Sequence, residues 1–398
     1  MIDLTTMLAA AFWLSFGGIV YCYIAYPILI RAASLVFGRR DEPPPLADKD
    51  LPDVSLLICA HNEQDVIERR IQNALESDYP QEKLEIAVAS DGSIDNTCAI
   101  VRKFAGQGVR LIEFPDNRGK ATALNQSIPQ LRGSIVALSD ANTYYDRDAI
   151  RQLARWLPDP SIVAVCGRLL LTDPETGKNA DSMYWKYETF LKRSEGKLGA
   201  LLGSNGAIYA IRRDQFVPIP SNTKIDDFVI PLVAKIRHGG RIVYEDRAMA
   251  RELTAPDLGS EFSRRARIGG GGVQSMQVLW PLLNPRQGWI ALVLFSHKIL
   301  RWLCPFLMIL LLAINLLLLN HPLYRWIMLL QIAFYLCSLI SAMLPVGIGI
   351  FKPLRLAAMF TGMNAALFVG MIQWMMGSRG GTWRRTSRRA EGPGPEAA

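Results

Sequence analysis

The sequence predicts an α/β domain with a mostly parallel sheet, covered by helices on both faces and inserted between membrane-spanning helices. Two observations lead to this fold class. Long apolar runs lie near both ends of the 398-residue chain, and short apolar strands alternate with amphipathic helices between them. Strands of a parallel sheet are buried on both faces and form short apolar runs, whereas a helix needs ~20 apolar residues to cross ~30 Å of hydrocarbon. Half of the residues are hydrophobic and a fifth are charged, which excludes a disordered chain.

The net charge of +8 is compatible with a nucleic-acid binder or with a membrane protein whose cytoplasmic loops carry Lys and Arg. Basic residues that bind nucleic acid cluster with exposed aromatic side chains, whereas many of those here flank apolar runs. We therefore expect no nucleic-acid partner. The six cysteines are scattered without a C-x-x-C pair, which predicts neither a disulfide framework nor a zinc module.

Four uncharged runs are each about long enough for a span, namely Met7–Ile30, Trp302–Leu319, Trp326–Phe351 and Leu356–Gly377. The first follows Asp3 rather than a basic segment and has no small-residue cleavage site, so we interpret it as a retained anchor. Pro345 and two glycines interrupt the third run, so its span is expected to end near Leu344.

Basic residues set the expected orientation. Arg31, Arg39 and Arg40 follow the first run, which predicts an outside N-terminus and a cytoplasmic domain after it. Three further spans would leave the C-terminus outside, yet the last segment is rich in Arg. Either one run does not cross, or the stretch 289–319 is more than one element. Residues 281–295 are expected to form a helix in the membrane interface or an ordinary helix of the domain.

These patterns divide the chain into six parts. They are an anchor (1–30), a linker (31–52), a cytoplasmic α/β domain (53–255), an Arg/Gly loop with an interfacial helix (256–298), about three transmembrane helices (299–377) and a flexible basic tail (378–398). The linker contains three consecutive prolines, and the tail contains Arg379, Arg384, Arg385, Arg388 and Arg389.

Four strands and three helices alternate in the first half of the domain. The strands are expected at Val54–Ala60, Leu84–Ala89, Val109–Phe114 and Ser134–Leu138, and the helices through Ile67 and Ile71, at Asn96–Phe104 and at Ala121–Leu131. This alternation is typical of a parallel sheet, and ligands of such sheets bind beyond the carboxyl ends of the strands.

Acidic residues stand at two of these strand ends, Asp91 after the second strand and Asp140 after the fourth. A single Asp at such a position is usually a cap or turn residue, which is our interpretation of Asp95. Two carboxylates at the ligand edge favour a binding site. Asn142 lies two positions after Asp140, so two oxygen donors can converge on Mg²⁺ or Mn²⁺.

Three other motifs place charged residues at the start of a helix or just before a run of glycines. Lys120 follows Gly119 at a helix start and suits phosphate oxygens, although the spacing of a Walker A loop is absent. Asp226 and Asp227 open another helix, and two acids exceed what capping requires, so one could act as general base. The basic segment Arg264–Arg267 runs into Gly269–Gly272. It could contact anionic lipid, or be a mobile loop that brings guanidinium groups to a pyrophosphate.

The order of these motifs resembles the family 2 glycosyltransferases, in the membrane branch that includes cellulose, hyaluronan and chitin synthase-like enzymes. The resemblance covers Val54–Gly272. It implies a GT-A-like, Rossmann-like fold and a hexosyltransferase-type enzyme that inverts the sugar configuration. The donor would be a nucleotide-diphosphate sugar, most simply a UDP-sugar, and the acceptor a polysaccharide, oligosaccharide or lipid-linked sugar.

The resemblance also implies roles for particular residues. The uridine would lie on Asp91 and on the first strand's end, which is Ala60, His61, Asn62 and Glu63. Lys120, in the stretch that matches G-K-x-x-A-L-N, would approach the diphosphate. Asp140 and Asn142 would hold the metal in place of D-x-D. The small-residue segment near the acceptor matches Gly203, Ser204 and Asn205.

The T-E-D motif of the family falls on Ile225–Asp227, so Asp227 would be the catalytic base beside Asp226. The Q-x-x-R-W motif falls on Arg264–Ile268, with Arg264 and Arg267 on the donor. Arg264 replaces Gln, and Ile268 replaces the Trp that stacks on an acceptor sugar in processive polymerases. Processive synthesis and a single transfer therefore both stay open.

The expected partners are the nucleotide-sugar donor, the carbohydrate or lipid-linked acceptor, the lipid bilayer, and export or assembly partners. The expected location is the bacterial inner membrane, crossed several times. Two other functions stay open. A nucleotidyltransferase also places Asp pairs at strand ends but needs no base at Asp227, and an inactive membrane partner could bind a nucleotide without transferring a sugar.

Overall fold

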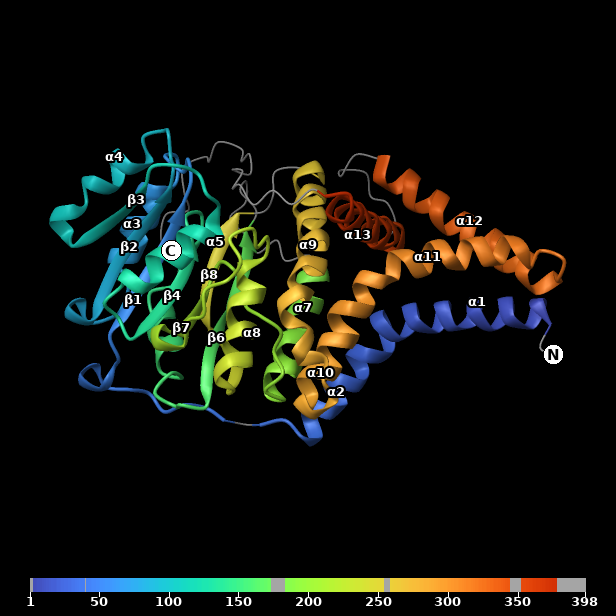
Figure 1. Cartoon of the computed structure of the whole chain (residues 1–398), viewed down its shortest axis with the longest axis horizontal. Helices are drawn as coiled ribbons and strands as arrows, with labels where there is room; N and C mark the ends of the chain where they lie inside the picture. The colour runs from blue at the N-terminus through green and yellow to red at the C-terminus, as the bar shows by residue number, and fades with distance from the viewer. Residues whose placement is uncertain (1–2, 40, 173–182, 254–257, 344–351, 378–398) are drawn as a thin grey trace. The chain divides into compact units, whose positions relative to one another are not determined.

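The computed structural model describes residues 3–39, 41–172, 183–253, 258–343 and 352–377, and the chain divides into two compact units (Figure 1). The α/β unit consists of Ile30–Ser260 and Gln274–Val293, together with the undescribed tail that starts at Arg379. The helical unit consists of Met1–Leu29, Glu261–Val273 and Leu294–Ser378.

One eight-stranded sheet forms the centre of the α/β unit, in the order β3-β2-β1-β4-β7-β6-β8-β5. Its strands are β1 (Val54–Ala60), β2 (Leu84–Asp91), β3 (Val109–Phe114), β4 (Ile135–Asp140), β5 (Tyr144–Tyr145), β6 (Ile162–Thr172), β7 (Tyr209–Arg212) and β8 (Arg241–Leu253). The first four in this order are parallel, as are β6 and β8, whereas β7 runs antiparallel to β4 and β6, and β5 to β8. The predicted mostly parallel sheet is confirmed.

The predicted bounds of β1 and β3 agree with the structure, whereas β2 and β4 continue to Asp91 and Asp140. Every residue of β1 is buried, because helices cover both faces of the sheet in its centre. The two acidic residues are therefore the last residues of their strands rather than parts of the following loops. Their carboxylates share one edge of the sheet.

The helices of this unit are α3 (Ile67–Leu75), α4 (Thr97–Arg102), α5 (Lys120–Ser127), α6 (Ala149–Ala154), α7 (Met183–Lys197) and α8 (Asp226–His238). Short 3₁₀ turns lie at Asp48–Asp50, Gln81–Lys83, Ala105–Gln107, Ile128–Gln130, Arg213–Gln215, Trp280–Leu283 and Pro285–Gln287. The helix predicted over 121–131 ends at Ser127, because Pro129 cannot continue the helical hydrogen bonds and a 3₁₀ turn follows. The helix predicted over 96–104 is likewise limited to α4.

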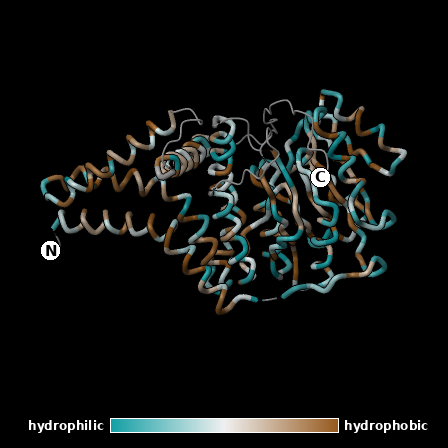
Figure 2. Tube along the Cα trace, turned by 180° about the vertical axis from the view of Figure 1, so that it is seen from behind, coloured by the Kyte–Doolittle hydropathy of each residue, from teal (hydrophilic) through white to brown (hydrophobic). Residues whose placement is uncertain are grey.

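Four helices among the described residues are long and apolar enough to cross a membrane (Figure 2). The first spans Leu4–Val36 and consists of α1 (Leu4–Val20), a π-helical turn (Tyr21–Ala25) and α2 (Tyr26–Val36). The second spans Trp289–Leu317 and consists of α10 (Trp289–Val293), a π-helical turn (Leu294–Ile299) and α11 (Leu300–Leu317). The others are α12 (Pro322–Met343) and α13 (Lys352–Met375). The first helix thus continues into the predicted linker.

The long helices of the helical unit do not all run the same way. In Figure 1, α1 and α11 lie across the view and α12 is also seen from its side, whereas α13 is seen nearly end-on, and Figure 2 shows the same from behind. Helix α13 therefore runs in a different direction from the other three. It packs on α12 and α11 through Phe360 near Phe334 and through Phe368 near Phe306, with ring centroids 6.3 Å and 5.1 Å apart.

The prediction of an Arg/Gly loop within 256–298 is wrong for its first half, because Leu258–Leu279 forms one helix, α9. Four consecutive glycines lie within this helix, and neighbouring helices leave no room for a side chain at three of them, Gly269, Gly270 and Gly272. A Cβ on Gly269 would lie 2.6 Å from the carbonyl oxygen of Leu367 in α13, and one on Gly272 would lie 2.5 Å from the ring of Trp302. The glycines therefore bring helices together.

The single helix predicted over 281–295 is also wrong. Two 3₁₀ turns, each with a proline near its start, and Gly288 with a φ of +67° precede α10. Proline removes a backbone donor and starts a new turn, so the segment cannot form one helix here. The predicted end of the third span near Leu344 agrees with α12, which ends at Met343, while Pro345 and the basic tail lie outside the described residues.

Candidate active site

The carboxylate of Asp91 holds the loop that starts α5. Its Oδ1 accepts a hydrogen bond from the backbone N–H of Arg118 at 3.0 Å, and its Oδ2 accepts one from Gly119 at 2.8 Å. Gly119 has a φ of +91°, which only glycine adopts readily and which turns the chain into the helix. The side chain at the end of β2 therefore places Lys120 at the same edge of the sheet.

The end of β1 forms a polar cluster beside Asp91. His61 Nδ1 lies 2.6 Å from the Asp91 carbonyl oxygen, so this nitrogen donates. Its Nε2 accepts from the amides of Asn62 and Asn117 at 3.2 Å and 3.0 Å. His61 and Glu63 are buried, and Asn62 has a φ of +55°. Together with Ala60, these residues lie where the resemblance expects the donor base.

Asp95 is a turn residue just before α4, one of the two roles predicted for it. Its Oδ1 accepts a hydrogen bond from the backbone N–H of Thr97, the first residue of α4, at 2.9 Å. Its Oδ2 accepts one from the backbone N–H of Gln64 at 3.2 Å. Asp95 therefore joins the β1 end to α4.

Lys120 connects two acidic motifs that are far apart in the sequence, Asp140 and Asp226. Its Nζ lies 2.7 Å from Asp140 Oδ1 and 3.3 Å from Asp226 Oδ2. Burial alone would lower the pKa of Lys120, but the two carboxylates outweigh it, so this pKa lies well above its ordinary value. The side chain is therefore a permanent cation at the sheet edge, between the end of β4 and the start of α8.

Asp227 is held by backbone groups at the start of α8. Its Oδ2 accepts from the backbone N–H of Gly206 at 2.9 Å, and its Oδ1 from that of Phe228 at 3.1 Å. Its carbonyl oxygen accepts from the backbone N–H of Ser204 at 2.9 Å. The small-residue segment and the proposed base thus lie against each other, which fixes the orientation of the carboxylate.

The close approach of this segment depends on Gly203. Its φ is +72°, and a Cβ there would lie 2.8 Å from the Cα of Phe228. The side chain of Asn205 points into the protein, since its Nδ2 donates to the Gly167 carbonyl at 2.8 Å and its Oδ1 accepts from Lys192. Asn205 therefore shapes the segment, and its predicted contact with an acceptor stays a prediction.

Two oxygen ligands for a divalent cation stand at the end of β4. Asn142 Nδ2 donates to Glu252 Oε1 at 2.6 Å, which leaves the amide oxygen as the atom that could coordinate a cation beside Asp140. Among the described residues no cluster of three His, Cys, Asp or Glu could hold a metal. Mg²⁺ is commonly bound by one or two protein oxygens, substrate phosphates and water, so this pair fits such an ion.

Three residues near this edge were missed by sequence reasoning. Glu252 orients Asn142 across a separation of 110 residues, and Lys192 reaches Asn205 from α7. Tyr209 on β7 is completely buried, and burial, with Asp226 as a second cause, raises its pKa well above the ordinary value. No local pattern marks Glu252 or Lys192, whereas Tyr209 is a polar side chain in a short apolar strand.

The arginines of α9 belong to the helical unit. Arg264 Nε lies 2.9 Å from Glu261 Oε2, and Arg265 Nε lies 2.6 Å from Glu261 Oε1. Both pairs are one helical turn apart, so they stabilise α9 itself. The donor-binding roles of Arg264 and Arg267 stay predictions.

Comparison with known proteins agrees with this geometry. Residues 55–215 match the family model described as glycosyl transferase family 2. This part of the chain is therefore similar to the family 2 glycosyltransferases. It is 30% identical over 239 residues to the poly-beta-1,6-N-acetyl-D-glucosamine synthase of Staphylococcus aureus strain MSSA476, which covers 58% of this chain and 57% of that enzyme. The enzyme of the same name from Staphylococcus epidermidis is 25% identical over 252 residues, which covers 61% and 60%.

The chain spans less than two thirds of the length of these curated relatives. A solved mannosyltransferase from Pyrobaculum calidifontis, in complex with GDP-Man and Mn²⁺, has the same fold. Its TM-score is 0.70 at 22% identity, over 94% of this chain and 99% of that chain. The predicted GT-A-like fold is confirmed.

Proposed function

We propose that this chain is a membrane-bound inverting glycosyltransferase that passes a sugar from a nucleotide-diphosphate sugar to a carbohydrate or lipid-linked acceptor. The observation that carries the proposal is the assembly of Lys120 with Asp140 and Asp226, next to Asp227, at the carboxyl edge of a GT-A sheet. The family 2 domain and its polysaccharide-synthase relatives support the same reaction class.

The donor half of the reaction uses the edge formed by β1, β2 and α5. The nucleoside would lie against the His61 cluster and Asp91, and the diphosphate against Lys120 and the N-terminus of α5. A divalent cation held by Asp140 and Asn142 would neutralise diphosphate charge when bound. Lys120 carries a full positive charge at neutral pH, so it can stabilise the negative charge that develops on the leaving diphosphate.

The acceptor half of the reaction uses the start of α8. Asp227 would remove a proton from an acceptor hydroxyl, which then forms a bond to the anomeric carbon as the bond to the diphosphate breaks on the opposite face. The hydrogen bonds from Gly206 and Phe228 hold the carboxylate in one orientation. A single displacement of this kind inverts the anomeric configuration.

The relatives support a specific donor. Both Staphylococcus enzymes are named as poly-beta-1,6-N-acetyl-D-glucosamine synthases, so we propose UDP-N-acetylglucosamine as the first donor to test. Ile268 stands where the resemblance expects an acceptor-stacking Trp, which supports a short product or a single transfer. Exchanging Ile268 for Trp is expected to lengthen the product if that position contacts the acceptor chain.

The direction of α13, which differs from that of the other long helices, supports a topology in which the basic residues after the first span and the basic tail lie on the same side of the membrane. With α1, α11 and α12 as spans and α13 lying along the interface, the α/β domain and the basic tail would both be cytoplasmic. Reporter fusions at His321 and after Gly377 test this. The first is expected outside and the second inside, and an outside reporter after Gly377 would make α13 a span.

The test of the function is nucleotide release by the full chain purified in detergent. A panel of UDP-sugars and GDP-mannose is offered with Mg²⁺, Mn²⁺ or EDTA, together with short N-acetylglucosamine oligomers as acceptors. Release that requires one sugar and a metal, with a product longer by that sugar, is the expected result. Absence of release, together with absence of UDP binding, would overturn the proposal.

A further inference from the structure

Arg70 is a completely buried cation that the reaction described above does not use. It lies on α3, and its side chain is 0% exposed. Ile67, Ile71 and Ala74 share its face of the helix, and all three pack in the core under the sheet. Arginine is almost never buried in this way without a charged partner.

Within the described residues, the guanidinium of Arg70 donates hydrogen bonds only to neutral groups. Its Nε and Nη2 lie 3.3 Å and 3.1 Å from Ser139 Oγ, and its Nη1 lies 3.0 Å from Asn73 Oδ1. Its Cζ lies 4.7 Å from the centre of the Tyr145 ring. Within the described ranges, no carboxylate forms an ion pair with Arg70. Burial lowers the pKa of Arg70 to about 10, so it is still charged at neutral pH.

The partners of Arg70 enclose the segment that carries the two candidate metal ligands. Ser139 precedes Asp140, and its Oγ donates to the Asp140 carbonyl oxygen at 3.0 Å. Tyr145 lies after Asn142, and its Oη donates to the Leu138 carbonyl at 2.9 Å. The Ser139 hydroxyl and the Tyr145 ring, which both contact the guanidinium, therefore lie at the two ends of the segment 139–145.

A second residue of α3 holds the far end of this loop. Asn73 Oδ1 accepts from the backbone N–H of Tyr145 at 2.8 Å, and its Nδ2 donates to the Tyr145 carbonyl at 2.9 Å. Arg70 Nη1 donates to the same Oδ1, so it also orients this amide. Helix α3 thus fixes both ends of residues 139–145 through Arg70.

We propose that Arg70 is a positioning residue that holds the 139–145 loop so that Asp140 and Asn142 present their oxygens together to a divalent cation. A buried charge without a counter-charge is costly, and an apolar side chain of similar size is often as stable or more stable in its place. Stability alone therefore does not account for an arginine here. Groups that orient metal ligands commonly change metal affinity when they are altered.

The inference rests on the proposed cation site, and its test measures binding and not only turnover. The full chain in detergent is titrated with Mn²⁺ in the presence of UDP, and free Mn²⁺ is followed by electron paramagnetic resonance. Arg70→Met, which keeps an unbranched stem but removes the charge and the donors, is expected to weaken Mn²⁺ binding by about 10- to 100-fold. The unfolding temperature is expected to stay close to that of the wild type.

Three further variants make the result specific. Arg102→Met removes an exposed arginine of α4 that pairs with Glu113, so it is the matched control and should bind Mn²⁺ as the wild type does. Ser139→Ala breaks the link between Arg70 and the segment 139–145, and Arg70→Lys keeps the charge but loses the planar guanidinium that reaches Ser139 and Asn73 together. Both are expected to weaken Mn²⁺ binding less than Arg70→Met, and they decide the question if Arg70→Met does not fold.

Asp140→Asn separates this inference from the proposed function. If it weakens Mn²⁺ binding and the Arg70 and Ser139 variants do not, the cation site stands and the role of Arg70 is overturned. If Asp140→Asn binds Mn²⁺ normally, the cation site itself is wrong and the role of Arg70 is overturned with it. A lower unfolding temperature with unchanged Mn²⁺ affinity in every Arg70 variant would identify a purely structural residue.

Discussion

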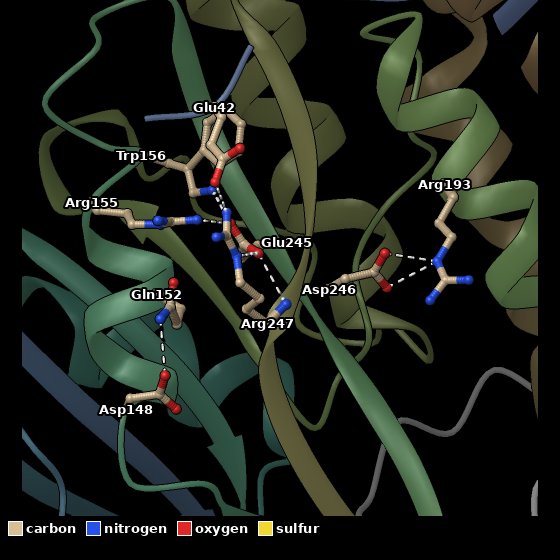
Figure 3. A network of polar contacts seen from close by, with 9 residues as sticks. All are labelled: Glu42, Asp148, Gln152, Arg155, Trp156, Arg193, Glu245, Asp246 and Arg247. Carbon is tan, nitrogen blue, oxygen red and sulfur yellow. Dashed lines mark hydrogen bonds and ion pairs between the residues drawn. The ribbon is translucent and has the colours of Figure 1, made fainter. Parts of the chain in front are cut away.

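Two charged clusters in the α/β unit differ in how completely their buried carboxylates are hydrogen-bonded. In the cluster around Glu245 (Figure 3), both oxygens of the carboxylate are satisfied, and this cluster is called closed below. Glu245 Oε2 accepts from Arg155 Nη2 and from Trp156 Nε1, both at 2.7 Å, and its Oε1 accepts from the backbone N–H and the Nε of Arg247 at 2.9 Å and 3.3 Å. The carboxylate is buried, and each of its two oxygens accepts two hydrogen bonds.

The cluster around Lys120 is open by comparison. Asp226 Oδ2 is buried and lies 3.3 Å from Lys120 Nζ, but it makes no hydrogen bond within the described part of the chain. Asp226 Oδ2 can still accept a hydrogen bond, which a donor group of a ligand could supply. We therefore expect the closed cluster to stabilise the fold and the open one to take part in the proposed reaction.

Asp227→Asn should give the largest effect on the open cluster. Loss of a general base is expected to lower sugar transfer by about 100-fold or more, while the affinity for the UDP-sugar is unchanged. Transfer is measured by nucleotide release and affinity by calorimetry. Asp148→Asn is the matched control, since Asp148 only accepts from Gln152 on α6 (Figure 3). Unchanged transfer in Asp227→Asn would remove this residue from the mechanism.

Glu245→Gln should have the opposite effect, lowering the stability of the fold and leaving sugar transfer unchanged. Removing the charge leaves Arg155 buried without its counter-charge, so the free energy of unfolding is expected to fall by about 3 kcal/mol. Denaturant unfolding of the full chain in detergent measures this. Transfer per folded molecule should stay at the wild-type level. A large loss of transfer in folded protein would show that the closed cluster also contributes to the reaction.

The pH dependence of stability should identify the same carboxylate. Burial alone would raise the pKa of Glu245, but the hydrogen bonds from Arg155, Trp156 and Arg247 outweigh it and hold the pKa below its ordinary value of 4.5. Its contribution is therefore complete above about pH 4.5 and is lost as the pH falls further. The difference in unfolding free energy between wild type and Glu245→Gln should be constant near neutral pH and should narrow below pH 4.5. A constant difference across that range would contradict the assignment.

Arg193→Ala should have the smallest effect. Arg193 Nε lies 2.7 Å from Asp246 Oδ2, but the two side chains are 45% and 40% exposed (Figure 3). Water and salt screen such a pair, so the free energy of unfolding is expected to change by less than about 1 kcal/mol. The same unfolding measurement checks this. A change as large as that of Glu245→Gln would show that exposure does not separate the two kinds of pair.

The sequence was sufficient for the parts of the site that depend on strand order. Asp91, Lys120 and Asp140 could be brought together from the pattern alone, because parallel strands end at one edge and each residue follows a recognisable apolar run. The partners of Asn142 and Asn205 could not, since Glu252 and Lys192 belong to other elements, β8 and α7, whose path no local pattern fixes. The position of Arg70 on the apolar face of α3 was visible in the sequence, although its contacts were not.

The predicted loop at Gly269–Gly272 failed for a different reason. Each glycine in a helix costs about 1 kcal/mol relative to alanine, so the intrinsic preference of this segment is against a helix. Contacts with other helices overrode that preference, and these contacts come from residues far along the chain. Propensity therefore gave the wrong answer where packing between distant segments decides the conformation.

This packing has a consequence for how the protein is made. A Cβ on Gly370 of α13 would lie 1.8 Å from the carbonyl oxygen of Ala266, so the backbones of α9 and α13 touch directly. The ribosome completes α9 before it begins α11, α12 and α13. The glycine stretch of α9 lacks part of its packing partners until the last of these emerges. We therefore expect a chain truncated before α13 to leave α9 incompletely packed and open to proteases.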